Sequence, residues 1–130
     1  MTVNDLIRRA MRSIGVLNHA EEPTSDEAAD ALQTLNDMLN AWIYEGMDLE
    51  FADDLVLTDT LPYPDDHAAA FRYALAVELA PEYGVQPPPA VLAMAANYKN
   101  ALKTRYIDPD TLGTDPFLSP VYNPNGYNFL

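Results

Sequence analysis

The sequence predicts an all-α fold: a small four-helix bundle with one short strand or hairpin in the loop between the second and third helices, followed by an extended C-terminal tail. Three observations favour this fold. Apolar residues recur at helical intervals of three and four in four stretches. Glycine and proline separate these stretches. The helical interval is lost after Tyr106, so we expect a helical domain over residues 1–107 and a tail over residues 108–130.

The composition is that of a single globular domain. The length of 130 residues fits one domain, and hydrophobic residues make up 48% of the chain, which is enough to bury a core. The absence of cysteine excludes disulfides and thiolate chemistry. The 20 acidic and 7 basic residues give a net charge of -13. This charge disfavours a conventional nucleic-acid binder, because it repels phosphates.

The first expected helix begins after Thr2, a good N-cap, and ends near Gly15. Arg8, Arg9 and Arg12 lie off its apolar stripe, so we expect these side chains to be exposed or paired with the acids of a neighbouring subunit. The stripe itself follows the period of a helix. Its members are Val3, Leu6, Ile7, Ala10, Met11 and Ile14.

The second expected helix begins at a capping box formed by Thr24 and Glu27 and runs to Gly46. Its apolar seam predicts packing against the first helix of the same chain, with Trp42 in the core. The seam consists of Ala28, Leu32, Leu35, Leu39 and Trp42. Polar residues occupy the other face, namely Asp30, Gln33, Asp37, Asn40 and Glu45.

The helical period is absent between Gly46 and Pro64. Residues 55–58 form a short extended pattern there, which predicts a strand or a small hairpin. Asp65 or Asp66 is then expected to cap a third helix. Because that helix is apolar on nearly all sides, we expect it to be central in the bundle.

Pro81 and Gly84 end the third helix, and a run of three prolines leads into a fourth helix over about residues 90–106. Basic residues near its C-terminal end suit the negative end of the helix dipole. They are Lys99, Lys103 and Arg105. The expected apolar face consists of Val91, Ala95, Tyr98, Leu102 and Tyr106.

The C-terminal tail combines four prolines and two glycines with large apolar residues. Disordered tails normally lack aromatic residues, so we expect this tail to dock on a protein surface. We favour another subunit or a partner, and docking on its own domain is the alternative. The large apolar residues are Phe117, Leu118, Val121, Tyr122, Tyr127, Phe129 and Leu130.

The sequence contains no motif for catalysis or phosphate binding. The adjacent pairs Asp53/Asp54 and Asp65/Asp66 are expected by chance in a chain this acidic. A calcium-loop pattern that opens at Asp108 has Leu112 in place of an oxygen ligand at its fifth position and Ser119 in place of the bidentate Glu at its last. We therefore expect no enzyme, no metal and no cofactor.

The first residues lack a signal-peptide pattern, and no apolar stretch reaches the roughly 20 residues of a membrane span. We expect a soluble protein that is made inside the cell.

The first 51 residues resemble a known family. The resemblance rests on the runs DLIRRAMRSIGVL (residues 5–17), EPT (22–24), DALQTLNDMLNAW (30–42) and EG (45–46). These runs are similar to the head-to-tail adaptor proteins of tailed double-stranded DNA bacteriophages, the tail accessory factor group.

The resemblance implies a structural virion protein made in the bacterial cytoplasm and located in the neck between capsid and tail. Such adaptors form a homo-oligomeric ring, commonly of twelve copies, beneath the portal protein. DNA passes through without specific binding, a downstream tail or nozzle protein is a further partner, and no membrane is involved.

A C-terminal extension of these adaptors grips the portal. The matching portal-binding candidates in this sequence are Phe117, Leu118, Pro120, Tyr122, Tyr127, Phe129 and Leu130. Candidates for contacts between subunits are Arg8, Arg9, Arg12, Asp30 and Asp37.

Two other functions stay open at this point. An acidic chain can mimic DNA and inhibit a DNA-binding enzyme. A small peptidoglycan hydrolase would need a pair of carboxylates.

Overall fold

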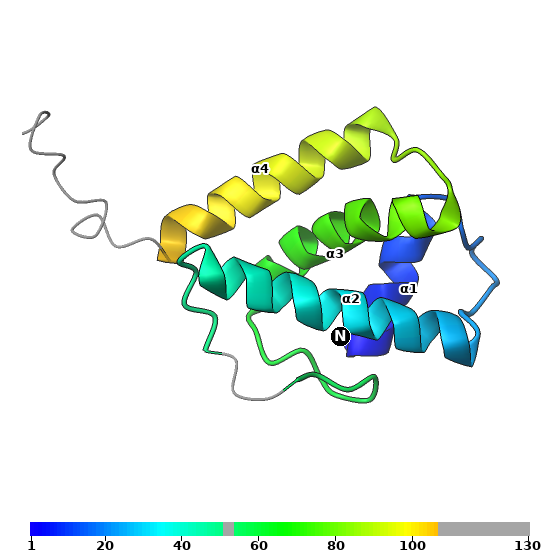
Figure 1. Ribbon diagram of the computed structural model, residues 1–130, viewed down its shortest axis with the longest axis horizontal. Helices are drawn as coiled ribbons and strands as arrows, with labels where there is room; N and C mark the ends of the chain where they lie inside the picture. The colour runs from blue at the N-terminus through cyan, green and yellow to red at the C-terminus, as the bar shows by residue number, and fades with distance from the viewer. Residues whose placement is uncertain (51–53, 107–130) are drawn as a thin grey trace, which may run out of the picture.

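The computed structural model describes residues 1–50 and 54–106, and within these residues the protein is all-helical (Figure 1). Helix α3 is the centre of the arrangement, since it contacts each of the other three long helices. The predicted central position of the third helix is thus confirmed. The elements are α1 (Val3–Ser13), α2 (Ser25–Tyr44), α3 (Asp65–Leu79), the 3-10 helix η1 (Ala80–Tyr83) and α4 (Pro89–Tyr106).

Capping boxes start both α1 and α2, which confirms the N-cap predicted at Thr2 and the capping box predicted at Thr24 and Glu27. The Asp5 backbone N–H donates to the Thr2 hydroxyl, and the Thr2 N–H donates to the Asp5 carboxylate at 3.2 Å. Thr24 and Glu27 make the same reciprocal pair at α2. Each box satisfies backbone donors that have no partner inside the helix. Left-handed glycines follow the two helices, namely Gly15 (φ 76°) and Gly46 (φ 101°).

The core lies where α1, α2 and α3 meet. Trp42 is 4% exposed and packs on Phe71 of α3, with 5.7 Å between ring centroids. The prediction that Trp42 belongs to the core is confirmed. The most deeply buried large side chains from the three helices are Leu6, Ile7, Met11, Leu35, Leu39, Phe71, Leu75 and Leu79.

Helix α4 lies along α3 and buries little of its own surface. Val91 and Leu102 are its buried residues, in agreement with the predicted face. Tyr98 is 43% exposed and stacks on Tyr73 of α3, with 5.7 Å between ring centroids. Leu92 and Met94 are also exposed, so α4 presents apolar side chains at the surface.

The predicted strand at residues 55–58 is wrong, because the structure has no strand within residues 1–50 and 54–106. The buried side chain of Asn36 instead binds the backbone of Leu55, accepting from its N–H at 2.9 Å and donating to its carbonyl at 3.1 Å. The carbonyls of Leu57 and Asp59 accept from the first backbone N–H groups of α1. The backbone N–H and C=O groups that a neighbouring strand would bind are therefore already hydrogen-bonded to a side chain and to the start of a helix.

The predicted cap of α3 is also wrong. The N-cap residue is Pro64, and no side chain makes a capping hydrogen bond there. Asp65 and Asp66 lie in the first turn, where negative charge stabilises the helix dipole. The Asp66 carboxylate is hydrogen-bonded to His67 and Arg105, so it is not available as a cap.

Candidate functional site

The seven portal-binding candidates and the rest of the predicted tail lie outside the described residues. Their attachment point is nevertheless visible, because α4 ends at Tyr106. The candidates for contacts between subunits, on α1 and α2, are described in full.

The three arginines of α1 differ in their surroundings. Arg8 pairs with Asp5 at 2.8 Å and with Glu22 at 2.9 Å. Arg12 donates to backbone carbonyls of the connection between α1 and α2, including that of His19 at 2.8 Å. Arg9 is exposed, and its side chain has no ion-pair or hydrogen-bond partner among the described residues. Two of the three arginines therefore hold their own chain together, and Arg9 is the one that faces outward.

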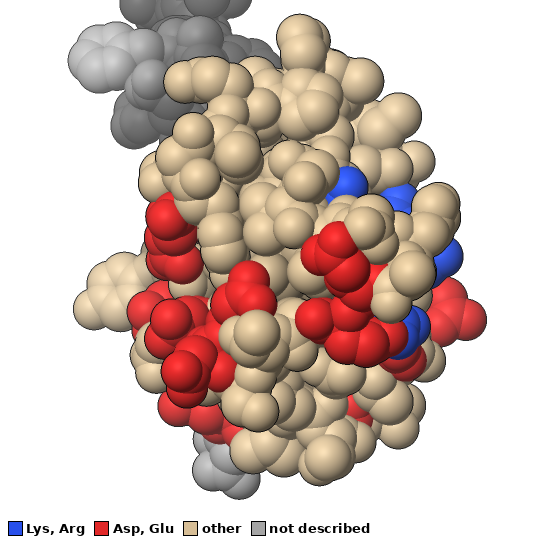
Figure 2. All heavy atoms as spheres, turned by 90° about the vertical axis from the view of Figure 1, so that its right-hand side faces the viewer, with Lys and Arg blue, Asp and Glu red and all other residues tan. Residues whose placement is uncertain are grey.

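Acidic side chains gather at the end of the molecule that carries the connection between α1 and α2. Asp30 and Asp37 are both exposed on α2. Glu82 of η1 lies close to α2 and accepts a hydrogen bond from Thr34 at 3.3 Å. Figure 2 shows acidic side chains across the middle and lower part of that end, with basic side chains only on the right-hand side of the view, beside acidic ones. Acidic side chains alone thus cover the left-hand side of this end, and both signs of charge meet on its right-hand side.

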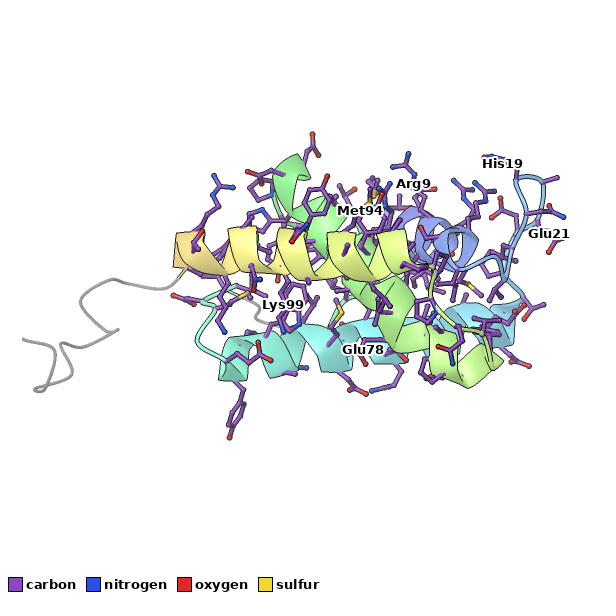
Figure 3. All side chains as sticks on the ribbon, turned by 90° about the horizontal axis from the view of Figure 1, so that it is seen from above. Arg9, His19, Glu21, Glu78, Met94 and Lys99 are labelled. Carbon is purple, nitrogen blue, oxygen red and sulfur yellow. The ribbon has the colours of Figure 1, made fainter. Side chains whose placement is uncertain are left out.

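An apolar groove of about 250 Å³ lies between α2 and α4, with α3 as its floor. Lys99 reaches across from α4 to Glu45 at 2.9 Å, and its amine lies 5.2 Å from the ring of Trp42. Figure 3 shows Lys99 directed from α4 toward α2, with Glu78 on the groove side of α3. This bridge closes one end of the groove.

A polar cluster that the sequence analysis missed ties the end of α4 to the start of α3. His67 is 3% exposed, and its Nδ1 lies 2.7 Å from an Asp66 oxygen. Its Nε2 is hydrogen-bonded to the Tyr106 hydroxyl, and Arg105 pairs with Asp66. The hydrogen bond from His67, followed by that from Arg105, lowers the pKa of Asp66, and burial raises the pKa of Tyr106. No local spacing could reveal this cluster, since it joins residues 39 positions apart.

The described part of the chain holds no group of three or more His, Asp or Glu side chains placed to bind a metal ion. Within residues 1–50 and 54–106, no helix has the length and apolar character needed to cross a membrane. The calcium-like pattern at Asp108 lies outside the described residues.

Comparison with known proteins points to one family. A family model described as P22 tail accessory factor matches residues 1–112, which include all four helices. No curated protein matches the chain.

Proposed function

Because the chain belongs to the P22 tail accessory factor family, we propose that it is a head-to-tail adaptor in the virion neck. It forms a ring beneath the portal, DNA passes through the ring, and the tail is built onto it. The family is a structural and non-enzymatic kind of protein, so the chain has a structural role in the phage tail as a component of the virion. The family match over residues 1–112 is the observation that carries the proposal.

The proposed ring, commonly of twelve copies, needs two different faces on each subunit, because a closed ring is built from head-to-tail contacts. Exposed basic and acidic side chains on different helices support this arrangement. Arg9 on α1 and the exposed Asp30 and Asp37 on α2 are suited to such contacts. Arg8 and Arg12 contribute by holding the connection between α1 and α2 in shape.

The net charge of -13 supports passage of DNA without retention. A channel lined with negative charge repels phosphates, so a DNA molecule can slide through it without being held.

The C-terminal tail carries portal attachment in this proposal. Large aromatic side chains dominate the binding energy of protein interfaces, and the tail holds Phe117, Tyr122, Tyr127 and Phe129. The cluster around His67 and Tyr106 fixes the end of α4, and it therefore gives the tail a defined starting point.

The test is co-assembly of the purified protein with its portal, followed by gel filtration and electron microscopy. Removal of residues 117–130 should abolish co-assembly, because the aromatic anchors are lost. The matched control, Asp53→Asn with Asp54→Asn, should leave co-assembly unchanged.

Three results would contradict the proposal. Undiminished portal binding by the truncated protein would move the contact to the bundle. Capture of a nuclease or polymerase in place of virion proteins would favour the DNA-mimic function. Cell-wall lysis that a carboxylate substitution abolishes would favour a hydrolase.

A further inference from the structure

A pocket of about 300 Å³ lies between α1, the start of α3 and the loop that precedes α3. Arg9 reaches it from α1, Tyr63 from the loop and Arg72 from α3. Ala68 and Ala69 contribute small side chains to its wall, and Asp65 is its one acidic residue. The two arginines outnumber this acid, so the lining side chains carry a net positive charge.

Two of the residues that line this pocket have a buried polar atom without a hydrogen-bond partner. The Nε of Arg72 and the hydroxyl of Tyr63 have no hydrogen bond among the described residues. Arg Nε is a donor only, and a tyrosine hydroxyl can donate. Burial raises the pKa of Tyr63 to about 12, so its hydroxyl keeps its proton. A buried donor without an acceptor is costly, so an acceptor that reached either atom would be bound favourably.

The pocket also holds most of the positive charge that the chain leaves unused. The structure describes all seven basic side chains. Arg8, Lys99 and Arg105 pair with carboxylates, and Arg12 binds carbonyls. Of the three that remain, Arg9 and Arg72 line the pocket and Lys103 does not. In a chain with 20 acids, two of the three basic side chains without an ion pair or hydrogen bond to a described residue therefore line one pocket. The guanidinium of Arg72 also lies over the Tyr73 ring, 4.4 Å from its centroid.

We propose that this pocket is a carboxylate-binding site that receives an acidic side chain from a second copy of the chain. A carboxylate accepts hydrogen bonds from Arg and Tyr and neutralises the excess positive charge. This inference rests on the ring of the proposed function.

Charge complementarity identifies a second copy as the source of the carboxylate. Residues 13–71 carry 14 acids and no lysine or arginine, and Asp30 and Asp37 stand exposed on α2. In Figure 3, Arg9 points away from the side of the molecule on which α2 lies. The donor pocket and the acidic helix therefore face different directions, as contact between successive ring subunits requires.

The first experiment measures anion binding by the full chain. Sodium acetate is titrated at constant ionic strength while NMR follows the Nε–H signal of Arg72 and the amide signals of Ala68 and Ala69. We expect saturable shifts that Arg9→Gln weakens several-fold. Lys103→Gln, which removes the same charge outside the pocket, should leave them unchanged.

Several outcomes of this titration would overturn the proposed carboxylate site. These are absence of a saturable acetate shift, an equal loss in both variants, or shifts with inorganic phosphate but not with acetate. The last result would indicate nucleic-acid phosphate as the ligand. Arg9 is exposed, so its substitution should leave the fold intact, and a thermal melt checks this.

The second experiment identifies the source of the carboxylate. The signals of Ala68 and Ala69 should shift in the acetate direction as the concentration of the protein itself is raised. The double variant Asp30→Asn/Asp37→Asn should lose this shift, and Glu50→Gln/Glu78→Gln should keep it. No dependence on protein concentration, or equal loss in both double variants, overturns the assignment to α2 of a second copy.

The proposed carboxylate site and the proposed ring can be refuted independently of each other. Rings seen by microscopy with a protein that binds no acetate would refute the site alone. Acetate binding by a protein that never forms rings with its portal would refute the proposed function and retain the anion site.

Discussion

Trp42 joins α2 to α3 through an aromatic contact. It is 4% exposed and touches Phe71. We predict that Trp42→Ala lowers the free energy of unfolding by about 3–5 kcal/mol, the cost of removing a buried aromatic ring. A denaturant titration measures this. Tyr44 on the same helix is 96% exposed, so Tyr44→Ala is the control and should change stability by less than about 0.5 kcal/mol. Equal effects would place Trp42 outside the core.

Asn36 decides the path of the loop before α3. Its side chain is 6% exposed and satisfies both backbone groups of Leu55. We predict that Asn36→Ala costs about 2–4 kcal/mol, because each buried polar group left without a partner costs about 1–3 kcal/mol. Asn40→Ala, at an exposed position of the same helix, is the control for changed helix propensity. Hydrogen exchange should show faster exchange of the Leu55 amide in Asn36→Ala only.

At the scale of elements, three carboxylates make the stability of the helix ends depend on pH. Hydrogen bonds with Thr2 lower the pKa of Asp5, those with Thr24 lower the pKa of Glu27, and that with His67 lowers the pKa of Asp66. A carboxylate whose pKa is lower in the folded state contributes stability above its unfolded pKa. That contribution is lost as the pH falls through the folded pKa.

We therefore predict that thermal stability falls as the pH drops below the ordinary values of 4.5 for Glu and 3.8 for Asp. The triple variant Asp5→Asn/Glu27→Gln/Asp66→Asn should be less stable at neutral pH and should show a flatter dependence below pH 4.5. Melting curves recorded by circular dichroism across this range measure both slopes. Parallel curves for the two proteins would show that other groups control acid unfolding.

At the scale of the whole molecule, the described helices form a hydrophobic core among themselves. The buried hydrophobic residues of the described chain run from Val3 to Leu102. We predict that removal of residues 117–130 leaves the helices and their cooperative unfolding intact. Circular dichroism checks this, with the full chain as reference. Loss of helical signal in the shortened protein would mean that the tail forms part of the core.

The sequence by itself determined the four helices and their order along the chain. Capping boxes, helix-ending glycines and an apolar period of three to four act over a few neighbouring residues, so they can be recognised along the chain. The apolar character of α3 on nearly all sides also predicted its central place. The resemblance in residues 3–51 pointed to the family that the match over residues 1–112 shows.

Only the tertiary structure decided the path of the loop before α3, the contacts at the end of α4 and the formation of the pocket. Residues 55–58 have the pattern of a strand, but Asn36 and the start of α1 take their backbone groups. His67 is hydrogen-bonded to Tyr106 across 39 positions, and Arg9 and Arg72 line one pocket because α1 packs on α3. Each of these contacts joins residues far apart in the chain. Their formation depends on how the helices pack, and no local spacing encodes it.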